Sequence, residues 1–144
     1  MNIKNYEIKE KKIMFMNKEK KMAKRIVQFL NKRGFIAKEH HSRTSKSIYI
    51  KIDNGAIPVI RISDHKRVND DNCKYNVIKD YKGPQYEIIM GKMKKYYTFK
   101  SIAKLITDIE LERHNKIMSL GYSNYRNILE GKKTARYNKY LKAA

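Results

Sequence analysis

The stretch Ser47-Ile-Tyr-Ile-Lys-Ile-Asp-Asn-Gly-Ala-Ile-Pro-Val-Ile-Arg-Ile-Ser63 contains two runs of alternating isoleucines on either side of Asn54-Gly55. Apolar residues at every second position are typical of a half-buried strand, and Asn-Gly is a strong turn signal. The stretch therefore predicts an antiparallel hairpin with Gly55 at a positive φ.

The alternation also predicts the register of this hairpin. A loop of residues 54–56 places all four flanking isoleucines on one face, whereas a slip of one residue would set Ile48 against Arg61. We therefore expect the pairs Ser47–Ser63, Ile48–Ile62, Tyr49–Arg61 and Ile50–Ile60.

Helical patterns flank this strand region. Asn17 has the character of an N-cap, and Gly34 ends an apolar stripe with helical spacing. A second stripe follows Ser101 and ends at Gly121, and a short helix is expected over residues 123–129. Further strands are expected at residues 35–40, 75–80, 86–90 and 96–99.

The order of these elements predicts an α+β fold. It has an N-terminal helix, an antiparallel sheet of about 4–5 strands, a long C-terminal helix and a short basic helical segment. We expect residues 1–16 to be a flexible or loosely packed arm, residues 17–130 a single α+β domain, and residues 131–144 a basic C-terminal segment.

The charge of the chain indicates a polyanionic partner. Lys and Arg number 34 against 14 Asp and Glu, a net charge of +20 in 144 residues. Like charges repel across a small fold, so such an imbalance is most useful to a protein that binds nucleic acid. The single Cys73 excludes an intramolecular disulfide, and no long apolar run is present, so we expect a cytoplasmic protein.

Two surfaces are candidates for this contact. The first is the polar face of the predicted hairpin and the loop after it, where aromatic rings can stack on bases and cations can meet phosphates. The second is the basic C-terminal segment, which can lie along a phosphate backbone. The candidate binding residues are Tyr49, Lys51, Arg61, Ser63, His65, Lys66, Arg67, Lys132, Lys133, Arg136 and Lys139.

Catalysis is the alternative from another class. His65, or His40 with His41, could serve a small nuclease that cleaves RNA or DNA by general acid–base chemistry. Asp53, with Glu87 and the later Lys92, could form a metal-dependent nuclease core, but the residue two positions after Glu87 is Ile89, which does not match an acidic-x-lysine element. We expect a binding protein rather than an enzyme, with no metal and no cofactor.

One segment resembles a known family. Thr44-Ser-Lys-Ser-Ile-Tyr-Ile50, followed by Ile60-Arg-Ile-Ser-Asp-His65, is similar to a strand pair in phage anti-CRISPR proteins directed at type II effector nucleases. The resemblance implies a phage-encoded inhibitor of a CRISPR ribonucleoprotein that acts in the bacterial host cell, with Arg61, Ser63 and His65 as the residues carried over. A net charge of +20 argues against a DNA mimic.

The first expectation is therefore a phage-encoded protein that binds nucleic acid or a ribonucleoprotein. A phage DNA-packaging or structural accessory protein is a further alternative. The sequence leaves open the choice between DNA and RNA, the host and the oligomeric state.

Overall fold

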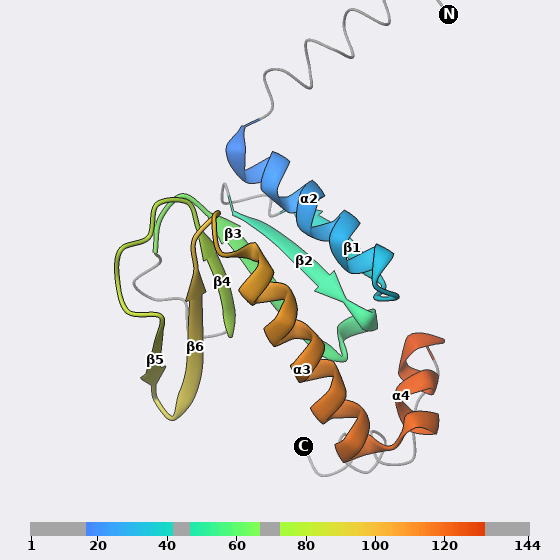
Figure 1. The fold of residues 1–144 in the computed structure, drawn as a ribbon. Coiled ribbons are helices and arrows are strands. Elements are labelled where there is room, and N and C mark those ends of the chain that lie inside the picture. Colours follow the sequence, from blue (N-terminus) through green and yellow to red (C-terminus); the bar gives the residue numbers. More distant parts are fainter. Residues whose placement is uncertain (1–16, 42–46, 67–72, 132–144) are drawn as a thin grey trace, which may run out of the picture.

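The computed structural model describes residues 17–41, 47–66 and 73–131 (Figure 1). The expected N-terminal arm and the basic segment after Gly131 lie outside the described residues. Five candidate binding residues also lie outside them, namely Arg67, Lys132, Lys133, Arg136 and Lys139.

The chain has an α+β fold, with one helix before the sheet and two after it. Its elements are α2 (Lys18–Lys32), β1 (Ala37–His41), β2 (Ile48–Ile52), the 3-10 turn η1 (Asp53–Gly55), β3 (Ile57–Ser63), β4 (Tyr75–Ile78), β5 (Tyr86–Ile89), β6 (Lys92–Tyr97), α3 (Ile102–Leu120) and α4 (Tyr122–Leu129).

Helix α2 forms where the sequence predicts it. The Asn17 side chain accepts a hydrogen bond from the backbone N–H of Lys20 at 2.8 Å, which confirms Asn17 as the N-cap. The apolar stripe packs against β1, β2 and β3. Gly34 follows the helix at φ +86°, a conformation that glycine adopts at little cost. The buried residues of the stripe are Met22, Ala23, Ile26 and Leu30.

The central hairpin has the predicted register. Ile48 pairs with Ile62, Tyr49 with Arg61, and Ile50 with Ile60. All four isoleucines are buried on the face that the helices cover. Gly55 has φ +89°, as expected, but Asp53 and Asn54 also have positive φ angles, and the loop covers residues 53–56 rather than 54–56.

The α+β class and the order of helix, sheet and helices are confirmed. The sheet has six strands, in the order β1-β2-β3-β4-β6-β5, and it is mixed rather than antiparallel. β3 and β4 are parallel, as are β4 and β6. A parallel pairing requires the chain between Ser63 and Tyr75 to return to the end of the sheet at which β3 begins. β5 and β6 form a hairpin through Met90 and Gly91, both at positive φ, and β6 lies between β4 and β5.

The helices α2 and α3 lie on one face of the sheet (Figure 1). The inner side of α3 buries Ile102, Leu105, Ile106 and Ile109 against β3 and β6. Helix α4 packs against α3 and η1, at the end of the sheet where β2 finishes. Within the described ranges, no helix has the length and apolar character needed to span a membrane.

Candidate nucleic-acid interface

The outer surface of α2 is strongly cationic. The helix has one acidic residue, Glu19, and none of its exposed cations forms an ion pair with another described residue. The guanidinium of Arg25 lies 5.7 Å from the ring centre of Phe29, whose side chain is 38% exposed. This surface, here called the α2 cationic face, consists of Lys18, Lys20, Lys21, Lys24, Arg25 and Lys32.

The α2 cationic face is unfavourable to the folded chain in isolation. Lys20 and Lys24 are four residues apart, as are Lys21 and Arg25, and each such like-charge pair costs about 0.2–0.5 kcal/mol. Lys18, Lys20 and Lys21 lie near the helix N-terminus, where the macrodipole disfavours positive charge. A bound polyanion removes both penalties at once.

The acidic residues of α3, in contrast, are engaged by neighbouring side chains. Glu110 pairs with Arg33 at 2.6 Å, and Glu112 pairs with Lys74 at 2.9 Å. Asp108 accepts a hydrogen bond from the Tyr97 hydroxyl at 2.6 Å. Burial, followed by this hydrogen bond, raises the pKa of Tyr97 above its ordinary value. These acids are matched locally and leave the excess positive charge on other surfaces.

The predicted polar face of the hairpin exists, but much of it is covered. Arg61 lies on the side opposite the isoleucines, yet it is only 1% exposed, and Ser63 is 3% exposed. The expectation that these two side chains face solvent is therefore wrong. Tyr49 is half-buried, and only Lys51 of the hairpin residues proposed for binding is exposed.

The described residues on either side of the gap between β3 and β4 lie close to this face of the sheet. The ammonium of Lys66 lies 5.0 Å from the ring centre of Tyr96 on β6. The carbonyl of Cys73 accepts a hydrogen bond from the side chain of Asn76, the strand neighbour of Arg61, at 2.9 Å.

Lys66 is exposed, but its charge is used within the fold. It pairs with Glu87 at 2.9 Å, and the Tyr96 hydroxyl also donates to Glu87. The Tyr96 hydrogen bond, followed by that of Lys66, lowers the pKa of Glu87. His65 is exposed and contacts Asp64, with Nδ1 2.6 Å from Oδ1.

The histidines do not converge on one site. His40 and His41 are consecutive residues of β1 and point to opposite faces of the sheet. Nε2 of His41 lies 3.5 Å from the Glu39 carboxylate, and both side chains belong to the same strand. Among the residues described, no group of three or more histidine, cysteine or acidic side chains could hold a metal ion.

The carboxylates proposed for a nuclease core are also separated. Asp53 is fully buried beneath α4, where its carboxylate pairs with Arg113 at 3.0 Å. Glu87 lies on β5, four strand positions from β2 in the sheet, a separation of about 19 Å. The hypothesis that these two carboxylates bind the same metal ion is therefore wrong.

No protein-family model, curated protein or solved structure matches this chain.

Further candidate binding residues, which no sequence motif marks, lie on α2 and at the start of β1. The helical pattern already placed the cations of α2 on its outer surface, and their lack of acidic neighbours was the available signal. Lys38 gave no such signal, because its position opposite Lys51 depends on the register of β1 with β2.

Proposed function

We propose that this protein binds nucleic acid, or a complex that contains it, through the α2 cationic face, as a binding protein rather than an enzyme. The proposal rests on one observation: within the described part of the chain, the exposed cations of α2 have no ion pairs, while the acids of α3 are paired elsewhere. A bound polyanion would offset the repulsion among these cations.

The dimensions of the α2 cationic face suit a phosphate backbone. A helix of 15 residues is about 22 Å long, which corresponds to about six nucleotide steps along one strand of a duplex. Lysine contacts of this kind fix position without reading sequence. Arg25 and the exposed Phe29 add a planar surface on which an unpaired base can stack.

The test is a binding titration with labelled single-stranded and double-stranded RNA and DNA, with and without a chelator. The informative variant combines Lys21→Gln, Lys24→Gln and Arg25→Gln. A matched control combines Lys82→Gln, Lys100→Gln and Lys116→Gln, which removes the same charge from exposed positions elsewhere. We expect the α2 variant to weaken binding by about tenfold or more, because a hydrogen bond from a charged side chain to a phosphate contributes about 1 kcal/mol or more.

Equal weakening by the two triple variants would show that only net charge matters, and would contradict a specific role for α2. Shortened nucleic acid after incubation would favour the nuclease alternative. Cleavage that the chelator abolishes would indicate a metal-dependent enzyme, despite the separation of Asp53 and Glu87.

A ribonucleoprotein is the more specific form of the proposal. The similarity of the hairpin segment to phage anti-CRISPR proteins motivates a trial against a guide-loaded type II effector nuclease. Since Arg61 and Ser63 are buried, the α2 cationic face is the better candidate for this contact. Inhibition of target cleavage that the α2 triple variant loses, and the matched control keeps, would support it. Unchanged cleavage at saturating protein would rule out this form.

A further inference from the structure

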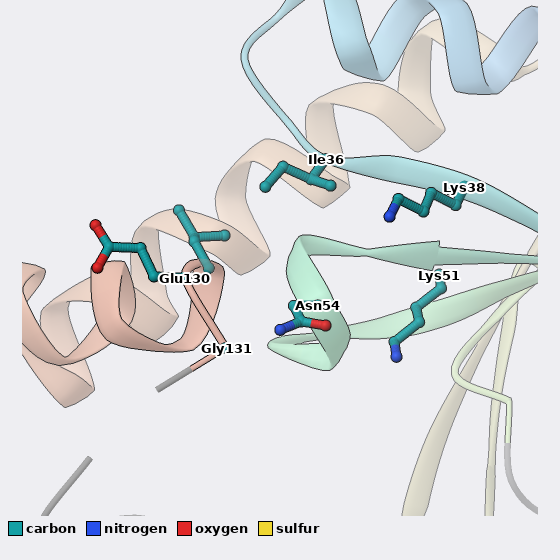
Figure 2. A pocket seen from close by; sticks show the side chains of 7 residues that line it. Ile36, Lys38, Lys51, Asn54, Glu130 and Gly131 are labelled. Atoms are coloured by element: carbon teal, nitrogen blue, oxygen red, sulfur yellow. The ribbon is translucent and has the colours of Figure 1, made fainter. Parts of the chain in front are cut away.

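A cleft of about 310 Å³ lies between the start of β1, the end of β2 and the C-terminal end of α4 (Figure 2). Its volume is at the lower end of the range for small-molecule sites and is sufficient for a single nucleotide. The cleft is lined by Ile36, Lys38, Lys51, Asn54, Leu129, Glu130 and Gly131.

Two lysines line this cleft. Lys38 and Lys51 are direct cross-strand partners, and both side chains are exposed. Like charges directly opposite each other destabilise a sheet, so this pair works against folding. Neither ammonium has a carboxylate partner in the described part of the chain. The pair therefore provides positive charge that an external anion can use.

The acidic residue of the cleft does not neutralise these lysines. Glu130 pairs with Arg126 at 3.3 Å, within the same helical turn. Figure 2 shows its carboxylate directed away from Lys38 and Lys51, while the Lys38 side chain extends toward Ile36 and Asn54. The interior of the cleft is thus positive on the side of the strands.

Two of the last carbonyls of α4 accept hydrogen bonds from groups other than Lys38 and Lys51. The carbonyl of Ile128 accepts hydrogen bonds from the backbone N–H of Gly131 and from the Asn54 amide, each at 3.0 Å. The carbonyl of Arg126 accepts from the Glu130 N–H at 3.0 Å. These bonds also fix the Asn54 amide at the wall of the cleft, where it keeps further hydrogen-bonding capacity.

We propose that this cleft binds one phosphate-bearing nucleotide unit. The phosphate lies between Lys38 and Lys51, and the apolar face of the base or sugar lies against Ile36 and Leu129. The unit is either part of the bound strand or a free nucleotide, and both present the same chemistry. The first source builds on the function proposed above, whereas the second is independent of it.

The test uses the full chain and adenosine monophosphate as the probe, followed through the backbone amide shifts of Lys38, Lys51 and Gly131. We expect saturable binding that the double variant Lys38→Gln, Lys51→Gln weakens by about tenfold or more. Adenosine, which lacks the phosphate, is expected to bind weaker by a similar factor, and inorganic phosphate is expected to compete. The control Lys82→Gln, Lys100→Gln removes equal charge away from the cleft.

Absence of saturable binding, equal affinity of the double variant and the wild type, or equal affinity for adenosine would each overturn the proposal. The melting temperature checks that the double variant is folded. We expect it to equal or exceed that of the wild type, because the variant loses the like-charge repulsion. If a short oligonucleotide displaces adenosine monophosphate, the cleft binds a nucleotide unit of the strand. If the oligonucleotide and adenosine monophosphate bind at the same time, the cleft binds a free nucleotide. Loss of oligonucleotide binding in the α2 triple variant reports on the other proposal alone.

Discussion

The hydroxyl of Tyr125 on α4 donates a hydrogen bond to the carboxylate of Asp53, the residue that directly follows β2. The same carboxylate accepts from the backbone N–H of Ile36 at 2.9 Å and pairs with Arg113 of α3 at 3.0 Å. One buried acid therefore joins the segment before β1, the end of β2 and both C-terminal helices. This junction fixes the walls of the cleft that Lys38 and Lys51 line.

Replacement of Tyr125 by phenylalanine tests this junction. The variant keeps the ring but leaves a buried carboxylate without one of its donors, which costs about 1–3 kcal/mol. Denaturant unfolding should show a lower midpoint with an unchanged m-value. Tyr122→Phe is the matched control, because Tyr122 is 70% exposed and should change stability little. Equal stability of both variants would show that the hydrogen bond contributes nothing.

The sequence predicts the central hairpin well, because only one register keeps Ile48, Ile50, Ile60 and Ile62 on one face. It fails for the strand order after Ser63. A pattern of alternating residues identifies a strand but does not say which neighbour it pairs with or in which direction, so it did not reveal the parallel pairing of β3 with β4.

The candidate site, like the fold, could be predicted from the sequence only in part. The cations of α2 could be placed on its surface from helical spacing alone, since their exposure depends only on the apolar stripe opposite them. The burial of Arg61 could not be predicted, because alternation along a strand shows which face a side chain lies on but not whether that face is covered. The opposition of Lys38 and Lys51 requires a register that no turn signal between β1 and β2 reveals.

The burial of Arg61 changes what its removal should do. A solvent-facing arginine could be deleted at little cost, but Arg61→Ala removes a large, fully buried side chain and should cost about 2–5 kcal/mol, as should Ile50→Ala. Thermal melting of both variants checks this. Lys51→Ala, on the same face but exposed, is the control and should retain the stability of the wild type. If the Arg61→Ala protein is stable but binds nucleic acid more weakly, Arg61 is a binding residue after all.

Binding to nucleic acid should weaken steeply with salt. If about five phosphates are neutralised, the logarithm of affinity falls with the logarithm of salt concentration at a slope near −4. The α2 triple variant should make this slope shallower by about 2–3, because each phosphate that is no longer neutralised keeps about 0.9 counterions on duplex DNA. Titrations at several salt concentrations provide the measurement. Affinity that is constant from low to moderate salt would contradict an electrostatic interface.

Removal of residues 132–144 should weaken binding and leave the described fold intact. The buried residues of the hydrophobic core end at Ile109, and the last buried side chain of the described chain is Tyr125. The truncated protein keeps Gly131, whose N–H bonds to the Ile128 carbonyl at 3.0 Å. Cooperative denaturant unfolding near the wild-type midpoint, with reduced affinity for nucleic acid, is the expected result. Loss of cooperative unfolding would show that the segment is structural.

The protein should lose stability at alkaline pH through its buried tyrosines. Burial and neighbouring carboxylates raise the pKa values of Tyr75, Tyr97 and Tyr125 above the ordinary value of 10.0. The folded state then keeps protons that the unfolded state releases. The stabilisation is complete below pH 10 and falls as the pH rises above it, by up to about 1.4 kcal/mol per pH unit for each tyrosine.

Denaturant unfolding at a series of pH values measures this slope. Lysines lose charge in the same range and relieve repulsion, which acts in the opposite direction, so the comparison must keep the lysines constant. Tyr97→Phe does so: it removes one titrating hydroxyl and should make the alkaline decline shallower than in the wild type. The exposed Tyr122→Phe should not change the slope. An identical decline in the Tyr97→Phe variant would assign the alkaline loss to other groups.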